Sequence, residues 1–409
     1  SGANSSIWIS QSISDTTYQY PISKSSYNND KSYGIIVHNQ NGSQAVSNNY
    51  SKPIIKLWDL EIDVNNTSLR EIQKTSDGGY VSAGYNWSGA GESYGDRVIK
   101  FDSDFNVEFS TSFSGLNGYI DVTNDGGFII GHKANGANGV LTKLSGTGTI
   151  EWSKNGQELQ GSGDHGGDIY DVHSVSDGYL FTITRGFSVG KVDLSGNTLW
   201  YYDNFYTSST SGGSYFARSI KEINSNSFVA VGHVSYPDSN GNNQQTAYMV
   251  IFDSAGNKIA EYFETNADYF YEVEILSNGD LLVIGSETND YSQPYRSMNG
   301  TGGYVSRFDN QGNMLWNHIQ QDDSVTMINF RDAIEKDDSN LLIAGHKLTS
   351  SGKSIYILEL DSNGGFVFDF VLTGDTPTTN WGGVSHSLIK SYDGSTILQT
   401  MRDISGRNY

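Results

Sequence analysis

The 409-residue sequence contains no cysteine and only 5 prolines. Without cysteine there are no disulfides, thiolate zinc sites or thiol nucleophiles, so a large core has to hold the fold together. No stretch shows sustained helical periodicity, and the longest apolar runs have the length of strands, not of membrane spans. The 47 glycines indicate many tight turns instead. Together these features predict an all-β protein that does not insert into a membrane.

Basic residues are also scarce. The chain has 25 Lys and Arg against 46 Asp and Glu, a net charge of -21. This charge argues against nucleic acid and anionic lipid as partners, and favours cations or neutral glycans. The polar first residues lack the charged start and apolar core of a signal peptide, as we expect for a mature or trimmed product.

What the sequence does contain is a repeat of about 40–50 residues, best seen over residues 70–110. This unit is predicted to form four short strands, joined by turn sequences such as Ser-Asp-Gly-Gly at 76–79. One small sheet cannot bury both of its faces, whereas sheets stacked around an axis can. Further copies cover residues 119–157, 170–202, 218–263, 271–320 and 331–372.

The two ends of the chain each carry part of one more unit. Residues 33–62 resemble outer strands, and residues 386–409 resemble the two inner strands. We therefore predict a seven-bladed β-propeller of four-stranded antiparallel blades. Residues 33–409 would form its single domain, closed by a composite blade from 33–62 plus 386–409. Residues 1–32 are predicted to be an N-terminal arm or cap, with one alternating stretch at 7–13.

Two repeated motifs resemble those of known propellers. The run Asp-x-x-Gly-Asn-x-x-Trp at 193–200 and 309–316 resembles the blade-docking motif of PQQ-type propellers. The turn at 76–80, followed by an apolar strand and glycine, is similar to propeller repeats of bacterial secreted and surface proteins. The resemblance implies a propeller fold and an exported protein. The vicinal cysteine pair of quinone alcohol dehydrogenases is missing, so no cofactor is expected.

Alignment of the repeats places two consecutive positions at the start of each innermost strand. In a closed ring these side chains should crowd around the axis at one mouth of a central channel. There, arginine and carboxylate either pair with each other and with water or bind a polar ligand. The candidate ligand-binding residues at these positions are Arg70, Glu71, Tyr170, Asp171, Arg218, Tyr271, Glu272, Arg331, Asp332 and His386.

Long loops are expected on the same face as this ring of residues, and they carry aromatic side chains. Trp87, Tyr94 and Trp381 are further candidates for ligand binding. Aromatic faces stack on sugar rings while short polar side chains bond to hydroxyls. The alternative is that these aromatics pack the loops onto the propeller.

Metal binding has weaker signals. His132, His233 and His346 each follow a glycine, but they fall in alternate repeats and show no ligand spacing. A second-strand histidine that bonds to a neighbouring turn is therefore the favoured interpretation. The acidic turns at 102–104 and 164–168 leave calcium open, although neither completes an EF-hand loop.

The sequence thus favours a non-catalytic binding or adhesion module, extracellular or on a bacterial cell surface, with a glycan or surface protein as partner. One alternative is a structural subunit that assembles through residues 1–32 onto another subunit's sheet edge. A second is a glycan-cleaving enzyme with two opposed carboxylates. No nucleophile, phosphate-binding or dinucleotide motif is present, which disfavours catalysis.

Overall fold

A computed structural model places most of the strands of the chain. The residues that it describes are 4–13, 36–38, 54–62, 67–86, 95–114, 116–133, 139–160, 167–184, 186–203, 214–237, 243–287, 302–322, 327–349, 352–372 and 387–402. Within these ranges the chain is all-β apart from one short helix, α1 (Gly156–Gln160). No helix there is long and apolar enough to cross a bilayer.

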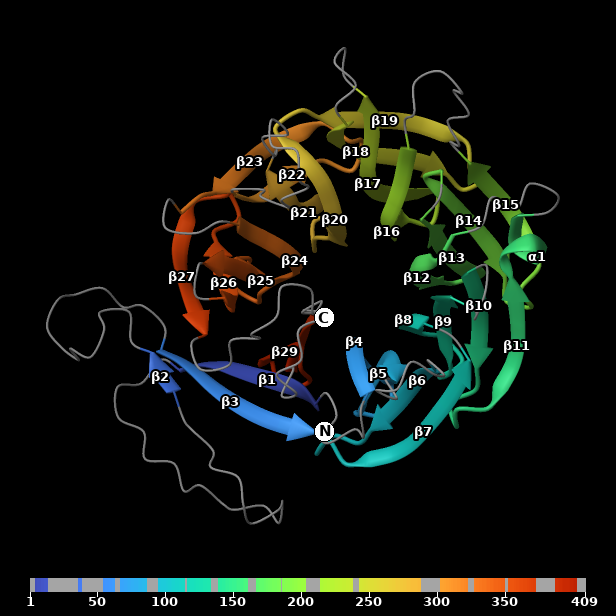
Figure 1. Ribbon diagram of the computed structural model, residues 1–409, viewed down its shortest axis with the longest axis horizontal. Coiled ribbons are helices and arrows are strands. Elements are labelled where there is room, and N and C mark those ends of the chain that lie inside the picture. Colours follow the sequence, from blue (N-terminus) through green and yellow to red (C-terminus); the bar gives the residue numbers. More distant parts are fainter. Residues whose placement is uncertain are drawn as a thin grey trace, which may run out of the picture.

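Six four-stranded antiparallel sheets, the blades, follow one another around a ring (Figure 1). The innermost strands are β4 (Thr67–Lys74), β8 (Leu116–Val122), β12 (Ile169–Val175), β16 (Ser214–Asn224), β20 (Ala267–Ile275) and β24 (Met327–Glu335). The second strands are β5 (Tyr80–Asn86), β9 (Phe128–Lys133), β13 (Gly178–Ile183), β17 (Ser227–Pro237), β21 (Leu281–Glu287) and β25 (Leu341–Thr349).

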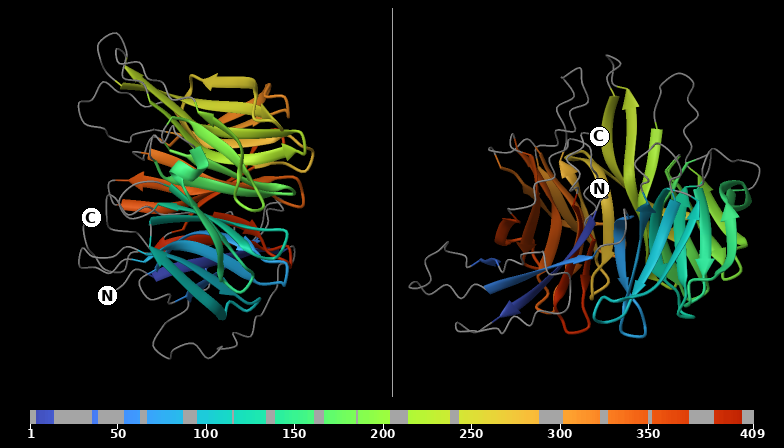
Figure 2. Two further views of the ribbon diagram at one scale, coloured as in Figure 1. Left: turned by 90° about the vertical axis from the view of Figure 1, so that its right-hand side faces the viewer. Right: turned by 60° about the horizontal axis from the view of Figure 1, so that its bottom comes forward.

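The outer half of each blade is a second hairpin. Its third strands are β6 (Gly95–Phe101), β10 (Gly139–Leu144), β14 (Ser188–Asp193), β18 (Asn243–Asp253), β22 (Gly303–Phe308) and β26 (Gly352–Leu360). The outermost strands are β7 (Val107–Ser114), β11 (Ile150–Asn155), β15 (Thr198–Asp203), β19 (Lys258–Glu264), β23 (Met314–Gln320) and β27 (Phe366–Leu372). Seen from the side, the strands of each blade run obliquely between the two faces of the ring (Figure 2).

The prediction of seven four-stranded blades is corrected to six. The remaining sheet, which we call the closing sheet, has five strands in the order β2-β3-β1-β29-β28. It joins β2 (Ile36–His38) and β3 (Ile54–Ile62) to β28 (Ser387–Lys390) and β29 (Thr396–Arg402). In this sheet the early strands lie outside and the late strands inside, next to β4 and β24.

The fifth strand of the closing sheet comes from the predicted arm. β1 (Asn4–Ile13) pairs with β29 on one side, Trp8 opposite Leu398, and with β3 on the other, Trp8 opposite Asp59. The alternation at 7–13 indicated a strand but not its partner, because β29 lies almost 390 residues further along the chain. The composite sheet therefore contains this segment as well as 33–62 and the C-terminal strands.

Repeated aspartates shape the turns between third and fourth strands. In the turn after β14, Asp193 Oδ1 accepts hydrogen bonds from the backbone amides of Ser195 and Asn197, at 2.9 and 2.8 Å. The intervening Gly196 has φ 81° and lies against the Trp152 ring of the preceding blade. The Trp152 Nε1–H donates to Leu194 O at 3.2 Å. The same turn thus closes one hairpin and docks it on its neighbour.

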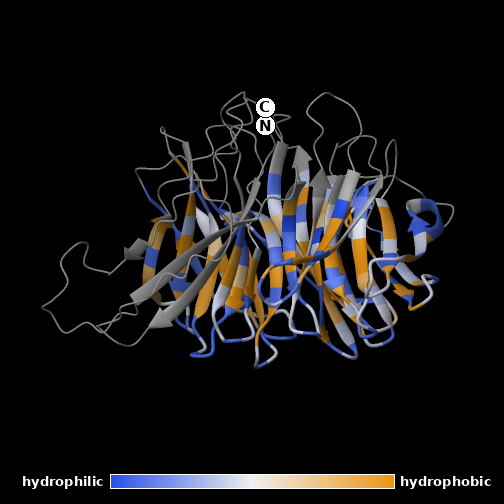
Figure 3. Cartoon of the chain, turned by 90° about the horizontal axis from the view of Figure 1, so that it is seen from below, coloured by the Kyte–Doolittle hydropathy of each residue, from blue (hydrophilic) through white to orange (hydrophobic). Residues whose placement is uncertain are grey.

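The hydrophobic core lies between neighbouring blades. Val231 and Met249 of one blade pack with Phe270 and Val283 of the next, and all four are at most 1% exposed. Apolar segments run along the strands while hydrophilic residues gather at the turns (Figure 3). Each sheet therefore buries both faces only because it has a neighbour on either side.

Candidate functional site: the axial cavity

A β-bulge in each innermost strand of five blades positions the residues that face the axis. Pairing with the second strand skips one residue in each case. The skipped residues are Arg70, Tyr170, Arg218, Tyr271 and Arg331. Regular alternation would send consecutive residues to opposite faces of the sheet, but a bulge allows two neighbours to share one face.

The residues around each bulge show this effect directly. In β4, Leu69 and Ile72 are fully buried in the core, whereas Arg70 and Glu71 between them both line the axial cavity. In four of these five blades the second strand carries a glycine opposite the bulge, whereas opposite the Tyr170 bulge it carries Ile183 and Thr182. A Cβ on Gly232 would lie 1.8 Å from Phe216 O. The glycine that ends the repeated apolar strand is thus explained by the close approach of the bulged backbone.

The cavity has a volume of about 650 Å³ and is lined by all six innermost blade strands and β28. Its side chains form three layers, counted from the end where the innermost strands begin. The first layer, the guanidinium layer, contains Arg70, Tyr170, Arg218, Tyr271 and Arg331. The second, the carboxylate layer, contains Glu71, Tyr119, Asp171, Glu272, Asp332 and Ser387. Ser219 holds the equivalent position of β16 but is fully buried and does not line the cavity. The third contains Gln73, Asp121, His173, Lys221, Glu274, Ile334 and Ile389.

Each arginine of the guanidinium layer lies over a tyrosine ring of an adjacent blade. The Cζ-to-centroid distances are 5.9 Å for Arg70 over Tyr119, 4.4 Å for Arg218 over Tyr170 and 4.1 Å for Arg331 over Tyr271. Such cation–π contacts stabilise a guanidinium without neutralising its charge.

The three guanidiniums also converge electrostatically on one phenol. Burial opposes ionisation of Tyr170, yet its pKa is lowered to about 8. The lowering comes from the positive charges of Arg218, Arg70 and Arg331. Three cations contributed by three different blades therefore act at the same place near the axis.

In the carboxylate layer, side chains bond to the backbone of the next sheet around the ring. Glu71 Oε2 accepts from Ile120 N at 2.9 Å, and Asp171 Oδ2 accepts from Ile220 N at 2.8 Å. Asp332 Oδ2 accepts from Leu388 N at 2.6 Å, which ties the last blade to the closing sheet. We call these contacts junction hydrogen bonds. They couple neighbouring innermost strands through polar contacts at the axis.

Burial dominates the protonation of this layer. It raises the pKa of Glu71 to about 8, with a further contribution from the charge of Asp171. It likewise raises the pKa of Asp332 to about 7, with a contribution from Glu274. The pKa of Glu272 is raised well above its ordinary value for the same reason. Near neutral pH the layer therefore carries less negative charge than its composition suggests.

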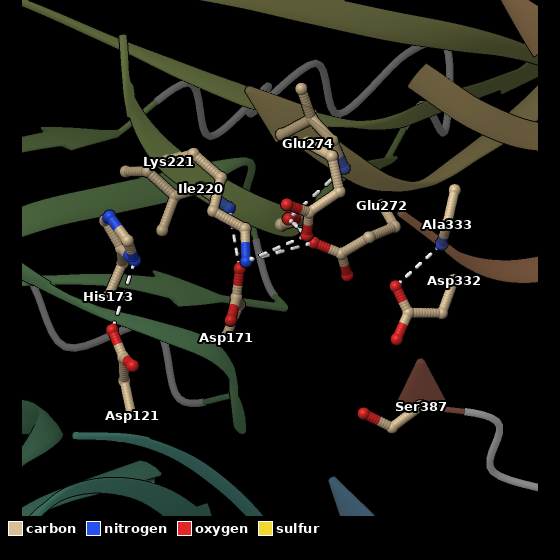
Figure 4. Close-up of polar contacts among 12 residues, drawn as sticks. Asp121, Asp171, His173, Ile220, Lys221, Glu272, Glu274, Asp332, Ala333 and Ser387 are labelled. Carbon is tan, nitrogen blue, oxygen red and sulfur yellow. Dashed lines mark hydrogen bonds and ion pairs between the residues drawn. The ribbon is translucent and has the colours of Figure 1, made fainter. Parts of the chain in front are cut away.

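The third layer contains the ion pairs of the cavity (Figure 4). Lys221 Nζ lies 3.3 Å from Glu274 Oε1 and 3.5 Å from Glu272 Oε1. Burial opposes the charge on Lys221, but the surrounding carboxylates raise its pKa well above the ordinary value. His173 Nδ1 lies 3.1 Å from Asp121 Oδ2, which also accepts from Ser174 N at 2.8 Å.

Nine of the candidate residues named from the sequence line this one cavity. They are Arg70, Glu71, Tyr170, Asp171, Arg218, Tyr271, Glu272, Arg331 and Asp332. His386, Trp87, Tyr94 and Trp381 lie outside the described residues. Ligand binding by any of them stays a prediction.

Sequence reasoning missed the third layer. Its residues follow the second layer by two positions, as Gln73 follows Glu71 and His173 follows Asp171. Simple strand alternation beyond the bulge would have found them.

Of the three histidines that follow glycine, His132 and His233 contact neighbouring side chains within their own blades, whereas His346 lines the axial cavity. The His233 ring stacks on Phe216 with centroids 4.6 Å apart, and His132 Nε2 lies 3.0 Å from Thr142 Oγ1. Across the described ranges no three His, Asp or Glu side chains are grouped so as to hold a metal ion. Calcium binding remains a prediction from composition.

No family model and no curated protein matches the sequence. Several solved structures are similar in shape. Sqt1 from Chaetomium thermophilum is 11% identical, with a TM-score of 0.44 over 84% of this chain and 98% of that one. The β-propeller domain of the Trilobed protease from Pyrococcus furiosus is 11% identical, with a TM-score of 0.41 over 79% and 85%. A Bacteroides caccae protein of unknown function is also 11% identical, with a TM-score of 0.39 over 65% and 86%. At these values the likeness carries no argument about function, and the propeller fold rests on the chain's own sheets.

Proposed function

We propose that this chain is a non-catalytic binding protein that recognises a glycan at the mouth of its axial cavity. The observation that carries the proposal is the guanidinium layer, in which half-buried tyrosine rings alternate with arginines around a cavity of about 650 Å³. Rings offer faces for stacking on sugars, and guanidiniums donate to hydroxyls or acidic groups. The volume falls in the range of ordinary small-molecule sites.

Two observations favour binding over the alternatives. The carboxylates Glu71, Asp171 and Asp332 each accept a junction hydrogen bond, so they have a structural role that a catalytic pair would not need. Strand β1 pairs on both sides within its own sheet, which disfavours assembly through this strand onto another subunit. Export to the cell surface, and kinship with PQQ-type repeats of bacterial secreted proteins, belong to the proposal as well.

A glycan array tests the proposal with wild-type protein and two variants. Tyr271→Ala removes a ring from the cavity, and Phe263→Ala removes an exposed ring from the outermost strand β19 as the matched control. We expect bound glycans to be lost in Tyr271→Ala and kept in Phe263→Ala. Absence of any glycan binding by folded wild-type protein would overturn the proposal. Equal binding by both variants would also overturn it.

A further inference from the structure

Two arginines of the guanidinium layer, Arg218 and Arg331, form no ion pair with any residue that the structure describes. Both line the cavity. The buried Nε of Arg218 has no hydrogen-bond partner within the same part of the chain. A buried guanidinium donor without an acceptor carries a free-energy penalty that a bound acceptor would relieve.

The described contacts of these arginines do not supply that acceptor. Arg218 lies over Tyr170 and Arg331 over Tyr271, and ring faces stabilise cations without forming hydrogen bonds. Tyr271 Oη is itself contacted by Asn329 Nδ2 at 3.3 Å. Planar N–H groups of the two guanidiniums therefore remain available to a ligand.

The carboxylate layer does not compensate the charge fully either. Its residues Glu71 and Asp332 have pKa values raised to about 8 and about 7, chiefly by burial. At neutral pH part of this layer is protonated, while the arginines stay charged. The mouth of the cavity thus keeps a local excess of positive charge on a protein whose net charge is -21.

We propose that Arg218 and Arg331 form an oxyanion-binding site that receives the acidic group of a glycan, either a uronate carboxylate or a sulfate ester. The inference rests on the proposed function and adds the charge of the ligand to it. Guanidiniums bind such groups through two parallel hydrogen bonds. Tyr170 and Tyr271 flank the site and pack against the sugar that carries the acid.

The net charge of the protein limits the length of this ligand. A long polyanion is repelled by a surface with 46 acidic and 25 basic residues. A short acidic oligosaccharide, or the acidic end of a longer neutral chain, is repelled only weakly because it carries few charges. The site therefore selects a terminal acidic sugar.

Calorimetric titration with three probes of equal length tests the proposal: trigalacturonate, galactotriose and galactotriose sulfate. We expect the acidic probes to bind at least about tenfold more tightly than the neutral one. Comparison of the two acidic probes identifies which oxyanion is preferred. Arg331→Gln should remove this preference, and Arg331→Lys, which keeps the charge but not the paired donors, should recover only part of it. Lys258→Gln on outermost strand β19 is the charge-matched control and should behave as wild type.

Failure of this inference is distinguishable from failure of the proposed function. Equal affinity for acidic and neutral probes, unaffected by Arg331→Gln, would overturn the oxyanion site and leave glycan binding standing. A second readout is independent of oligosaccharides, because an anion at the arginines should raise the pKa of Tyr170. Saturating galacturonic acid should therefore move the tyrosinate absorbance titration of Tyr170 to higher pH. No movement, together with no preference for acidic probes, would refute the site.

Discussion

Glu71 makes the stability of this propeller depend on pH in a direction opposite to that of most paired carboxylates. Its pKa is raised from 4.5 to about 8 because burial and the charge of Asp171 oppose ionisation. Between these values the folded state holds a proton that the unfolded state has released. The unfolding free energy therefore falls as pH rises through this window. The stabilisation is present in full below about pH 4.5 and is lost by about pH 8.

Glu71→Gln replaces this group with a neutral side chain of the same shape. The amide oxygen can still accept the hydrogen bond from Ile120 N. Each pH unit between the two pKa values changes the unfolding free energy by about 1.4 kcal/mol, so the full effect is on the order of 5 kcal/mol. We expect the variant to gain about 4 kcal/mol of this relative to wild type between pH 5 and pH 8.5.

Urea unfolding followed by tryptophan fluorescence, from pH 5 to pH 9, measures this difference, with refolding checked at each pH. Asp104→Asn, which removes an exposed carboxylate from a turn of the same blade, is the control and should leave the wild-type pH profile unchanged. If Glu71→Gln and wild type lose stability in parallel as pH rises, the assignment of a proton to buried Glu71 is refuted.

Three other predictions concern the phenol, the ring closure and the turns. Tyrosinate absorbance should show one tyrosine titrating near pH 8, since three guanidiniums lower the pKa of Tyr170. This prediction is contradicted if the step near pH 8 persists in Tyr170→Phe. Asp332→Ala should cost about 1–3 kcal/mol in urea unfolding because a buried backbone amide loses its acceptor, whereas Asp332→Asn should keep most of that stability. Gly364→Ala should lower the thermal unfolding temperature more than Gly279→Ala does. Both glycines have φ above 80°, but only a Cβ at position 364 would meet another residue, the Trp316 ring at 2.7 Å. Equal unfolding temperatures of the two variants would show that the Trp316 ring moves aside.

The blades were predictable because their signals are local. Asp193 and Gly196 mark a turn whose hydrogen bonds join residues at most four positions apart. The apolar runs beside such turns have the length of strands. The place of β1 was not predictable in the same way. Alternation at 7–13 indicates a strand but cannot name a partner, and here the partners are β29 and β3.

The sequence predicts that the axial residues lie together, but not the backbone geometry and hydrogen bonds that hold them there. Alignment of repeats brings equivalent positions to one axis, which is why Arg70 and Arg218 were expected together. No residue of the innermost strand itself marks the bulge that lets both Arg70 and Glu71 face the cavity, because it depends on a backbone shift against β5. Its one trace in the sequence is the glycine opposite, Gly84. The junction hydrogen bonds were invisible for a related reason, since their donors are main-chain amides that any residue supplies.

The pairing of β1 between β29 and β3 also sets an order in time. During synthesis β1 and β3 are made before β29, so the sheet that they share lacks its inner half until all six four-stranded blades have been made. The six four-stranded blades each consist of consecutive strands, so they can form as they appear. Closure of the ring then follows the six blades, and β1 and β3 keep an unpaired strand edge until β29 is made.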